Sequence, residues 1–351
     1  MTRKINYDIH NLISIEILTR SKLDLLKDLN FFLSYFETED IGNPDIELNI
    51  GEFSPSNTDC YIVDHKYYIK ENYFYCSDQI GNVKFNVEIF GFEKGKSVVN
   101  FDGNVHGLEQ LLIPDYLAQN MILRPLIELK LLQRGYAVIH GLGLEKNGKS
   151  VILAGRGGSH KTSIAMTALR NNYRLIGDDR VILSSDGKVY SYPFYHKLIR
   201  FKADCLSEEH VSSIFDKYRM LKYLNSNIED DTRLKYFSDI GTLSEFILLA
   251  KSDSSELVSR DLDVRSTASK LINNSKMEMV SSGISRSLGK INFLKYMCAY
   301  SYVFPDSYIS NYWLLLSEFL MDALNGTHLT HVRLPMNYDS IIFQRLVEES
   351  W

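Results

Sequence analysis

The chain has 351 residues, of which 45% are hydrophobic and 24% are charged, and its formal net charge is −5. This length favours two domains, and the composition is typical of a folded protein and excludes general disorder. Because basic residues are not in excess, the charge argues against nucleic acid as a partner of the whole surface.

The cysteines and the apolar runs bear on the cellular compartment. The four cysteines are scattered and form no C-x-x-C pair, so neither a zinc site nor a disulfide framework is expected. The N-terminus lacks the apolar segment of a secretory signal, and no run approaches the roughly 20 apolar residues that cross a bilayer. We therefore expect a cytoplasmic protein without a membrane partner.

Residues 1–104 are predicted to form a β-rich α+β domain. Short runs of β-branched and aromatic residues alternate with turn formers, and a helical periodicity precedes them at Leu23–Phe36. We expect most of the tyrosines to pack on strand faces. The predicted strands are Ile46–Ile50, Tyr61–Val63, Tyr67–Ile69, Tyr73–Tyr75 and Val83–Ile89.

Residues 105–135 are predicted to form a helical bridge to a second domain. Apolar residues recur there mostly at steps of three and four, which is the spacing of a helix face. Pro114 and Pro125 are expected to divide the run into shorter helices, because proline interrupts the helical hydrogen bonds.

Residues 136–351 are predicted to form an α/β domain. Its first part alternates strands with a glycine-rich loop and one helix, and this order is typical of a phosphate-loop (P-loop) nucleotide-binding core. The predicted elements are strands Tyr136–His140 and Ser150–Ala154, the glycine-rich run Gly155–Gly158, the helix Lys161–Leu169, and strands Tyr173–Ile176, Arg180–Leu183 and Val189–Tyr192.

The loop Gly155–Thr162 follows the pattern G-x-x-x-x-G-K-[ST], except that His160 replaces the last glycine. Backbone N–H groups of such a loop point at a phosphate, and the following helix N-terminus adds partial positive charge. In this pattern Lys161 reaches the β- and γ-phosphates, and the hydroxyl of Thr162 binds Mg²⁺. Histidine tolerates a positive φ better than most residues, so His160 can substitute for the glycine. The alternative is a strand-to-helix turn with an incidental lysine.

Asp178 and Asp179 follow the next predicted strand, where parallel α/β sheets place their ligands. A P-loop kinase needs a carboxylate for Mg²⁺ and often a base for the acceptor hydroxyl. One aspartate on the metal and one near the acceptor is the simplest arrangement, and a solvated turn is the alternative. We expect a functional role for His140 only if the end of its strand lies next to this aspartate pair.

These pieces together resemble the kinase domain of bacterial HPr kinase/phosphorylase and the wider HPr-kinase-like group, whose core is shared with phosphoenolpyruvate carboxykinase. The resemblance covers residues 137–181 and includes Asp-Asp-Arg-Val at 178–181. It implies a base at Asp179, a metal or hydrogen-bonding partner at Asp178, and His140 beside the pair. It also implies a nucleotide site, with Lys161 taking part in catalysis. The residues assigned to the nucleotide are Gly155, Arg156, Gly157, Gly158, Ser159, His160, Lys161, Thr162 and Ser163, and those assigned to Mg²⁺ are Thr162 and Asp178.

The favoured hypothesis is an ATP- and Mg²⁺-dependent kinase. It would transfer the γ-phosphoryl group to a serine or threonine of a protein or peptide, or to a small-molecule alcohol. The glycine-rich signature tied to dephosphorylation has no match after Tyr192, so phosphorylase activity is not expected. The missing signature and His160 motivate an alternative, a nucleotide-binding regulatory protein with little or no turnover. A carboxykinase-like lyase ranks last, because no cluster of manganese ligands is visible. Since HPr kinases are oligomers, the resemblance also implies a homo-oligomer.

The remaining residues are predicted to complete the second domain. The polar segment Phe201–Ser238 reads as an insertion that covers the site. An arginine in or beside Asp263–Lys290 could neutralise the phosphoryl group in transfer, although each also reads as a surface charge. The arginines are Arg260, Arg265 and Arg286, and the further predicted elements are strands Ser244–Leu249 and His331–Leu334 and helices Tyr312–Leu324 and Tyr338–Glu348.

Overall fold

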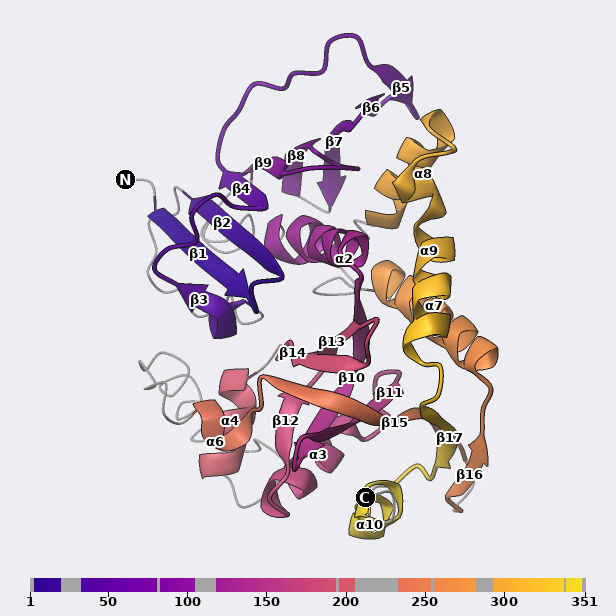
Figure 1. The fold of residues 1–351 in the computed structure, drawn as a ribbon. Helices are drawn as coiled ribbons and strands as arrows, with labels where there is room; N and C mark the ends of the chain where they lie inside the picture. The colour runs from indigo at the N-terminus through magenta and orange to yellow at the C-terminus, as the bar shows by residue number, and fades with distance from the viewer. Residues whose placement is uncertain are drawn as a thin grey trace. The chain divides into compact units, whose positions relative to one another are not determined.

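The computed structural model describes residues 3–19, 33–80, 83–104, 118–193, 196–205, 233–253, 256–281, 293–337 and 339–348. The fold is mixed α/β and divides into two compact units (Figure 1). Unit 1 comprises Met1–Arg134 with Lys276–Leu316, and unit 2 comprises Gly135–Ser275 with Ser317–Trp351. Residues 276–316 therefore group with the N-terminal unit, whereas the sequence suggested one continuous domain over 136–351.

Unit 1 contains a nine-stranded sheet with the order β3-β1-β2-β4-β9-β8-β7-β6-β5. Strands β2, β4 and β9 pair in parallel, and the other neighbours pair antiparallel. The five strands predicted in this region are confirmed, and β7 is longer than expected. The strands are β1 (Arg3–Ile9), β2 (Ile13–Thr19), β3 (Glu37–Thr38), β4 (Ile46–Ile50), β5 (Tyr61–Val63), β6 (Tyr67–Lys70), β7 (Tyr73–Ile80), β8 (Val83–Phe90) and β9 (Ser97–Asn104).

The described helices of unit 1 include the 3-10 helix η2 (Ser34–Phe36), the π-helix η4 (Ala118–Leu123), α2 (Arg124–Gln133) and α8 (Phe293–Val303). Pro125 lies in the first turn of α2, where a helix tolerates proline. Most of the predicted helix Leu23–Phe36 and Pro114 lie outside the described residues.

Aromatic contacts explain why α8 belongs to unit 1. The ring of Tyr296 lies 4.8 Å from that of Phe74 on β7, measured between centroids. Tyr300 accepts a hydrogen bond from the backbone N–H of Asn72 at 2.9 Å and donates one to Glu93 at 3.0 Å. These partners are more than 200 residues apart in the chain, so no local sequence pattern could reveal them. Tyr67 is buried beside Tyr296, as the prediction of strand-face packing requires.

Unit 2 contains a sheet with the strand order β11-β10-β13-β14-β15-β17-β16, and β12 also pairs with β10. Strand β15 pairs in parallel with β11 and β17, and the remaining pairs are antiparallel. Because β15 pairs with both β14 and β11, five strands form a closed ring of pairings. The strands are β10 (Tyr136–Lys146), β11 (Lys149–Gly155), β12 (Arg174–Gly177), β13 (Arg180–Ser184), β14 (Lys188–Ser191), β15 (Ile240–Lys251), β16 (Val258–Asp261) and β17 (His328–Leu334).

The predicted strands of unit 2 are confirmed, with β10 and β15 longer than expected. Helix α3 (Lys161–Arg170) is also confirmed, and it contacts β10, β12, α4 (His196–Cys205) and α10 (Ser340–Leu346). The sequence did not predict α4 as a helix. The short α6 (Arg233–Tyr236) follows residues 206–232, which hold most of the predicted insertion and lie outside the described residues.

Two long helices contain the unit boundaries. Helix α7 (Val264–Ser281) occupies most of the stretch predicted as helix-prone, and α9 (Tyr308–Ala323) matches the predicted core helix. The end of that stretch, with Arg286, is outside the described residues. The predicted closing helix is α10.

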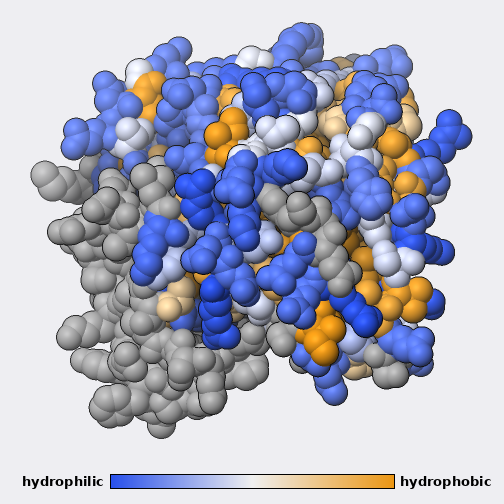
Figure 2. Space-filling model, turned by 60° about the horizontal axis from the view of Figure 1, so that its bottom comes forward, coloured by the Kyte–Doolittle hydropathy of each residue, from blue (hydrophilic) through white to orange (hydrophobic). Residues whose placement is uncertain are grey.

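The buried apolar residues of the described part come from strands and helices, including the long helix α9. None of the helices in the described ranges is long and apolar enough to cross a bilayer. On the face drawn in Figure 2, hydrophilic residues predominate among those coloured, and hydrophobic residues form small separate groups.

Candidate functional site

A glycine-rich loop, Gly155–His160, connects β11 to α3. A Cβ atom on Gly155 would lie 2.8 Å from both the carbonyl oxygen of Leu249 and the Oγ of Ser159, so this position has no room for a side chain. Gly158 has a φ of 85°, which favours glycine. The loop therefore leaves β11 close against the backbone of β15 and turns sharply before the helix begins.

His160 stands in the left-handed region, with φ 60° and ψ 13°, immediately before α3. The expectation that histidine would adopt the glycine-like conformation is confirmed. Its Nε2 lies 3.1 Å from the carbonyl oxygen of Pro335. Since a carbonyl oxygen only accepts, this nitrogen carries the hydrogen. The bond holds the imidazole of His160 against the residue that follows β17.

Lys161 is the first residue of α3, and its side chain is directed into the site. Its ammonium donates to the carbonyl oxygen of Gly155 and lies 3.4 Å from that of Arg156. It also lies 3.5 Å from Nε2 of His140, at the outer limit of a hydrogen bond. Lys161 is 8% exposed, so this cation lies at the base of the loop rather than in bulk solvent.

Strand β10 brings the loop and the two aspartates to one edge of the sheet. Strands β11 and β12 are both antiparallel to β10, so they run in the same direction and end on the same side. They are not neighbours, because β10 lies between them. The backbone N–H of Gly141 on β10 donates to the carbonyl oxygen of Asp179 at 2.9 Å, which fixes the turn across the strand.

The turn between β12 and β13 is tight. A Cβ on Gly177 would lie 1.8 Å from the carbonyl oxygen of Arg180, so only glycine fits. Asp178 and Asp179 occupy the two positions between these residues. Asp178 is 9% exposed, and the side chain of Asp179 is 27% exposed. Asp178 is therefore buried in the turn, whereas Asp179 keeps partial access to solvent.

His140 lies between Lys161 and Asp179. The predicted strand ended at His140, but β10 continues to Lys146 and changes partner from β13 to β11 after His140. Nδ1 of His140 lies 3.6 Å from Oδ1 of Asp179, and Nε of Arg180 lies 4.0 Å from Oδ2. Nε2 of His140 thus faces the ammonium of Lys161, and Nδ1 faces the carboxylate of Asp179.

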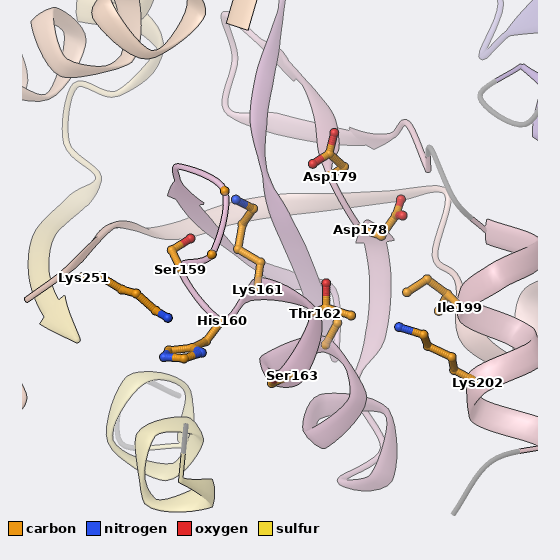
Figure 3. A pocket seen from close by; sticks show the side chains of 13 residues that line it. Ser159, His160, Lys161, Thr162, Ser163, Asp178, Asp179, Ile199, Lys202 and Lys251 are labelled. Carbon is orange, nitrogen blue, oxygen red and sulfur yellow. The ribbon is translucent and has the colours of Figure 1, made fainter. Parts of the chain in front are cut away.

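A cavity of about 520 Å³ opens over these groups within unit 2 (Figure 3). This is the size of pocket that small-molecule ligands occupy. It is formed by the loop and α3, by the β12–β13 turn, by α4 and by the end of β15. Its lining residues are Gly157, Gly158, Ser159, His160, Lys161, Thr162, Ser163, Ala165, Asp178, Asp179, Ile199, Lys202 and Lys251.

Most residues assigned from the sequence line this cavity, and three do not. Gly155 and His140 lie behind it, where they contact Lys161. The exposed side chain of Arg156 points elsewhere and donates to Asn274 at 3.3 Å. None of the arginines considered from the sequence is among the lining residues of the described chain.

Four lining residues were not assigned from the sequence: Ala165, Ile199, Lys202 and Lys251. Lys251 ends β15, a strand that the sequence predicted up to Leu249, and strand ends at this edge of a sheet commonly carry ligand contacts. That rule could have indicated Lys251. Lys202 lies on the unpredicted helix α4, and no local signal distinguishes it from a surface lysine.

Among the described residues, no group of three or more His, Cys, Asp and Glu side chains is arranged to hold a metal ion. Mg²⁺ in phosphate sites uses one or two protein ligands and takes the rest from phosphates and water. Thr162 is exposed and lines the cavity together with Asp178. This hydroxyl and carboxylate are hard oxygen donors, which suit Mg²⁺.

The chain was compared with known proteins and families. No protein-family model matches it, and no curated protein matches it significantly. The geometry of the cavity is therefore the basis for assigning a function.

Proposed function

We propose that the chain is an ATP- and Mg²⁺-dependent kinase of the HPr-kinase-like type, which transfers the γ-phosphoryl group to a hydroxyl. The acceptor is a serine or threonine of a protein or peptide, or a small-molecule alcohol. The observation that carries the proposal is that one cavity is lined both by Gly157–Thr162 and by Asp178 and Asp179. A phosphoryl-transfer site needs both parts, one for the phosphates and one for the metal and the acceptor.

The loop and Lys161 are proposed to bind the phosphates. Backbone N–H groups at the start of α3 and the lysine ammonium are suited to a triphosphate. The glycine-like conformation of His160 supports this role, because the loop follows its path without the usual glycine. Thr162 and Asp178 would hold Mg²⁺, which supplies charge neutralisation to the phosphates when it is bound.

Asp179 is proposed to act as the base. It accepts the proton of the acceptor hydroxyl as the acceptor oxygen forms its bond to the γ-phosphorus. The bond between that phosphorus and the bridging oxygen breaks, and the nucleoside diphosphate leaves with the electron pair. His140 is a positioning residue, because its Nδ1 faces Asp179 while its Nε2 faces Lys161.

The test is label transfer from γ-labelled ATP with Mg²⁺ to free serine and threonine, simple sugars, peptides and a cell lysate. Asp179→Asn is expected to lower transfer by about 10²–10⁴ and to leave ATP binding intact. Lys161→Ala is expected to weaken both. Asp261→Asn is the matched control, because this carboxylate is 88% exposed on β16 and does not line the cavity.

A nucleotide-binding regulator is the alternative that the same assay resolves. If wild-type protein binds ATP in a Lys161-dependent way and no acceptor receives label, the kinase proposal is wrong. Transfer that survives Asp179→Asn would contradict the assignment of the base while leaving the kinase activity in place.

A further inference from the structure

Lys202 enters the cavity from helix α4, on the side of the aspartates. It is three residues after Ile199, so the two side chains share one helix face, and both line the cavity. Figure 3 shows its ammonium directed toward Thr162 and the neighbourhood of Asp178. Helix α4 contacts α3, whose second residue is Thr162.

The two other lysines of the cavity lie elsewhere. Lys161 is held at the base of the loop by the carbonyl oxygen of Gly155. Lys251 approaches from the end of β15 and points toward Ser159 and His160 (Figure 3). Of the three lysines that line the cavity in the described part of the chain, Lys202 is therefore the one on the side of Thr162 and Asp178. These two residues are proposed to hold the metal.

Among the described residues, none of the arginines considered from the sequence lines the cavity. The guanidinium of Arg260 donates from Nε to Nδ1 of His331 at 3.2 Å, on the β16–β17 pair. Arg265 lies on α7, and neither residue lines the cavity. Phosphoryl transfer nevertheless gains from a cation that meets the charge developing on the phosphoryl oxygens.

We infer that Lys202 is a catalytic residue that binds the phosphoryl group during its transfer and supplies the role expected of an arginine. This inference rests on the proposed kinase function, because the phosphoryl group in transfer would lie beside Thr162 and Asp178, and the ammonium of Lys202 is directed toward Thr162 (Figure 3). Binding of the nucleotide before transfer depends mainly on the loop, so Lys202 acts on the transfer step.

The test does not need the identity of the acceptor. ADP with aluminium fluoride and Mg²⁺ mimics the planar phosphoryl group in transfer, and its affinity is compared with that of ADP and Mg²⁺ alone by calorimetry. Wild-type protein is expected to bind ADP more tightly with aluminium fluoride. Lys202→Gln is expected to lose that gain by on the order of 10²-fold, the effect of removing one preorganised charge-stabilising donor. Its affinity for ADP alone and its unfolding midpoint are expected to stay within about threefold and a few degrees of wild type.

Two variants complete the design. Lys202→Arg should retain much of the gain, because it keeps a positive charge at the same place. Lys188→Gln is the control, since this exposed lysine on β14 pairs with Asp186 and is outside the cavity lining.

The failures are distinguishable. Wild-type protein that binds neither ADP nor ATP overturns the proposed function together with this inference. An undiminished gain in Lys202→Gln overturns the inference alone, as does an equal loss of affinity for ADP with and without aluminium fluoride.

Discussion

The left-handed conformation of His160 predicts an unusual order of stability among its variants. A residue other than glycine in this region costs roughly 1–2 kcal/mol. Glycine relieves that cost but gives the unfolded chain more freedom, which lowers stability by about 0.4–1 kcal/mol. Both His160→Gly and His160→Ala lose the hydrogen bond to Pro335, which contributes about 1 kcal/mol, so this loss cancels in the comparison. His160→Gly should therefore be more stable than His160→Ala by about 0.5–1 kcal/mol.

The assay is equilibrium unfolding in urea of the two His160 variants beside a matched pair at Thr167. Thr167 lies within α3, and both of its variants lose the same hydroxyl. In a helix interior the order is reversed, and Thr167→Gly should be about 1 kcal/mol less stable than Thr167→Ala. If His160→Gly is also the less stable member of its pair, the left-handed conformation assigned to His160 is wrong.

Three further predictions concern the site and unit 1. Gly177→Ala places a Cβ 1.8 Å from the carbonyl oxygen of Arg180, so it should lower the free energy of unfolding by about 3 kcal/mol or more, as measured by thermal unfolding. The control Gly187→Ala places its Cβ in open space and should cost about 1 kcal/mol. Equal losses in the two variants would refute the steric argument. Burial raises the pKa of Glu128 to about 7 from its ordinary 4.5, so the folded chain keeps a proton there that the unfolded chain releases, and stability falls as pH rises through that window. Glu128→Gln should remove this loss of stability and be more stable than wild type at pH 8 by about 3 kcal/mol at most. Urea unfolding of both proteins at pH 5 and pH 8 measures the difference, and a variant with the same pH dependence as wild type would contradict the prediction. If the proposed function holds, Lys251→Gln should weaken ATP binding about three- to tenfold, because an exposed ammonium contributes modestly to phosphate binding. Calorimetry that finds no change would exclude Lys251 from the proposed nucleotide site.

The local pattern of the chain was sufficient for most strands and for α3, and insufficient for α8. The strands of unit 1 alternate buried and exposed residues or carry β-branched and aromatic runs, which local reading detects. The sequence Phe293–Val303 is rich in aromatic residues that favour strands, yet it forms a helix. Its rings pack on Phe74 and Phe92, and such tertiary contacts override local propensity.

Part of the candidate site could likewise be predicted from local sequence patterns, and part could not. The loop residues and the aspartates have a recognisable spacing, because one helix and one strand fix the distance between them along the chain. Lys202 and Lys251 enter the cavity from segments 40 or more residues away from the loop, through packing of α4 on α3 and pairing of β15 with β11. Neither packing nor strand pairing is encoded by the residues next to a lysine, so these two contacts required the structure.

The position of the aspartates near the loop could be anticipated, although the pairing of the strands was not predicted from the sequence. The prediction required only that the strand before the loop and the strand before the aspartates end on the same side of the sheet. That condition holds whenever both strands are antiparallel to one strand between them, as β11 and β12 are to β10. The intervening strand also carries His140, which lies between Lys161 and Asp179. The three-strand arrangement thus brings the loop and the carboxylates to one edge of the sheet and places His140 between them.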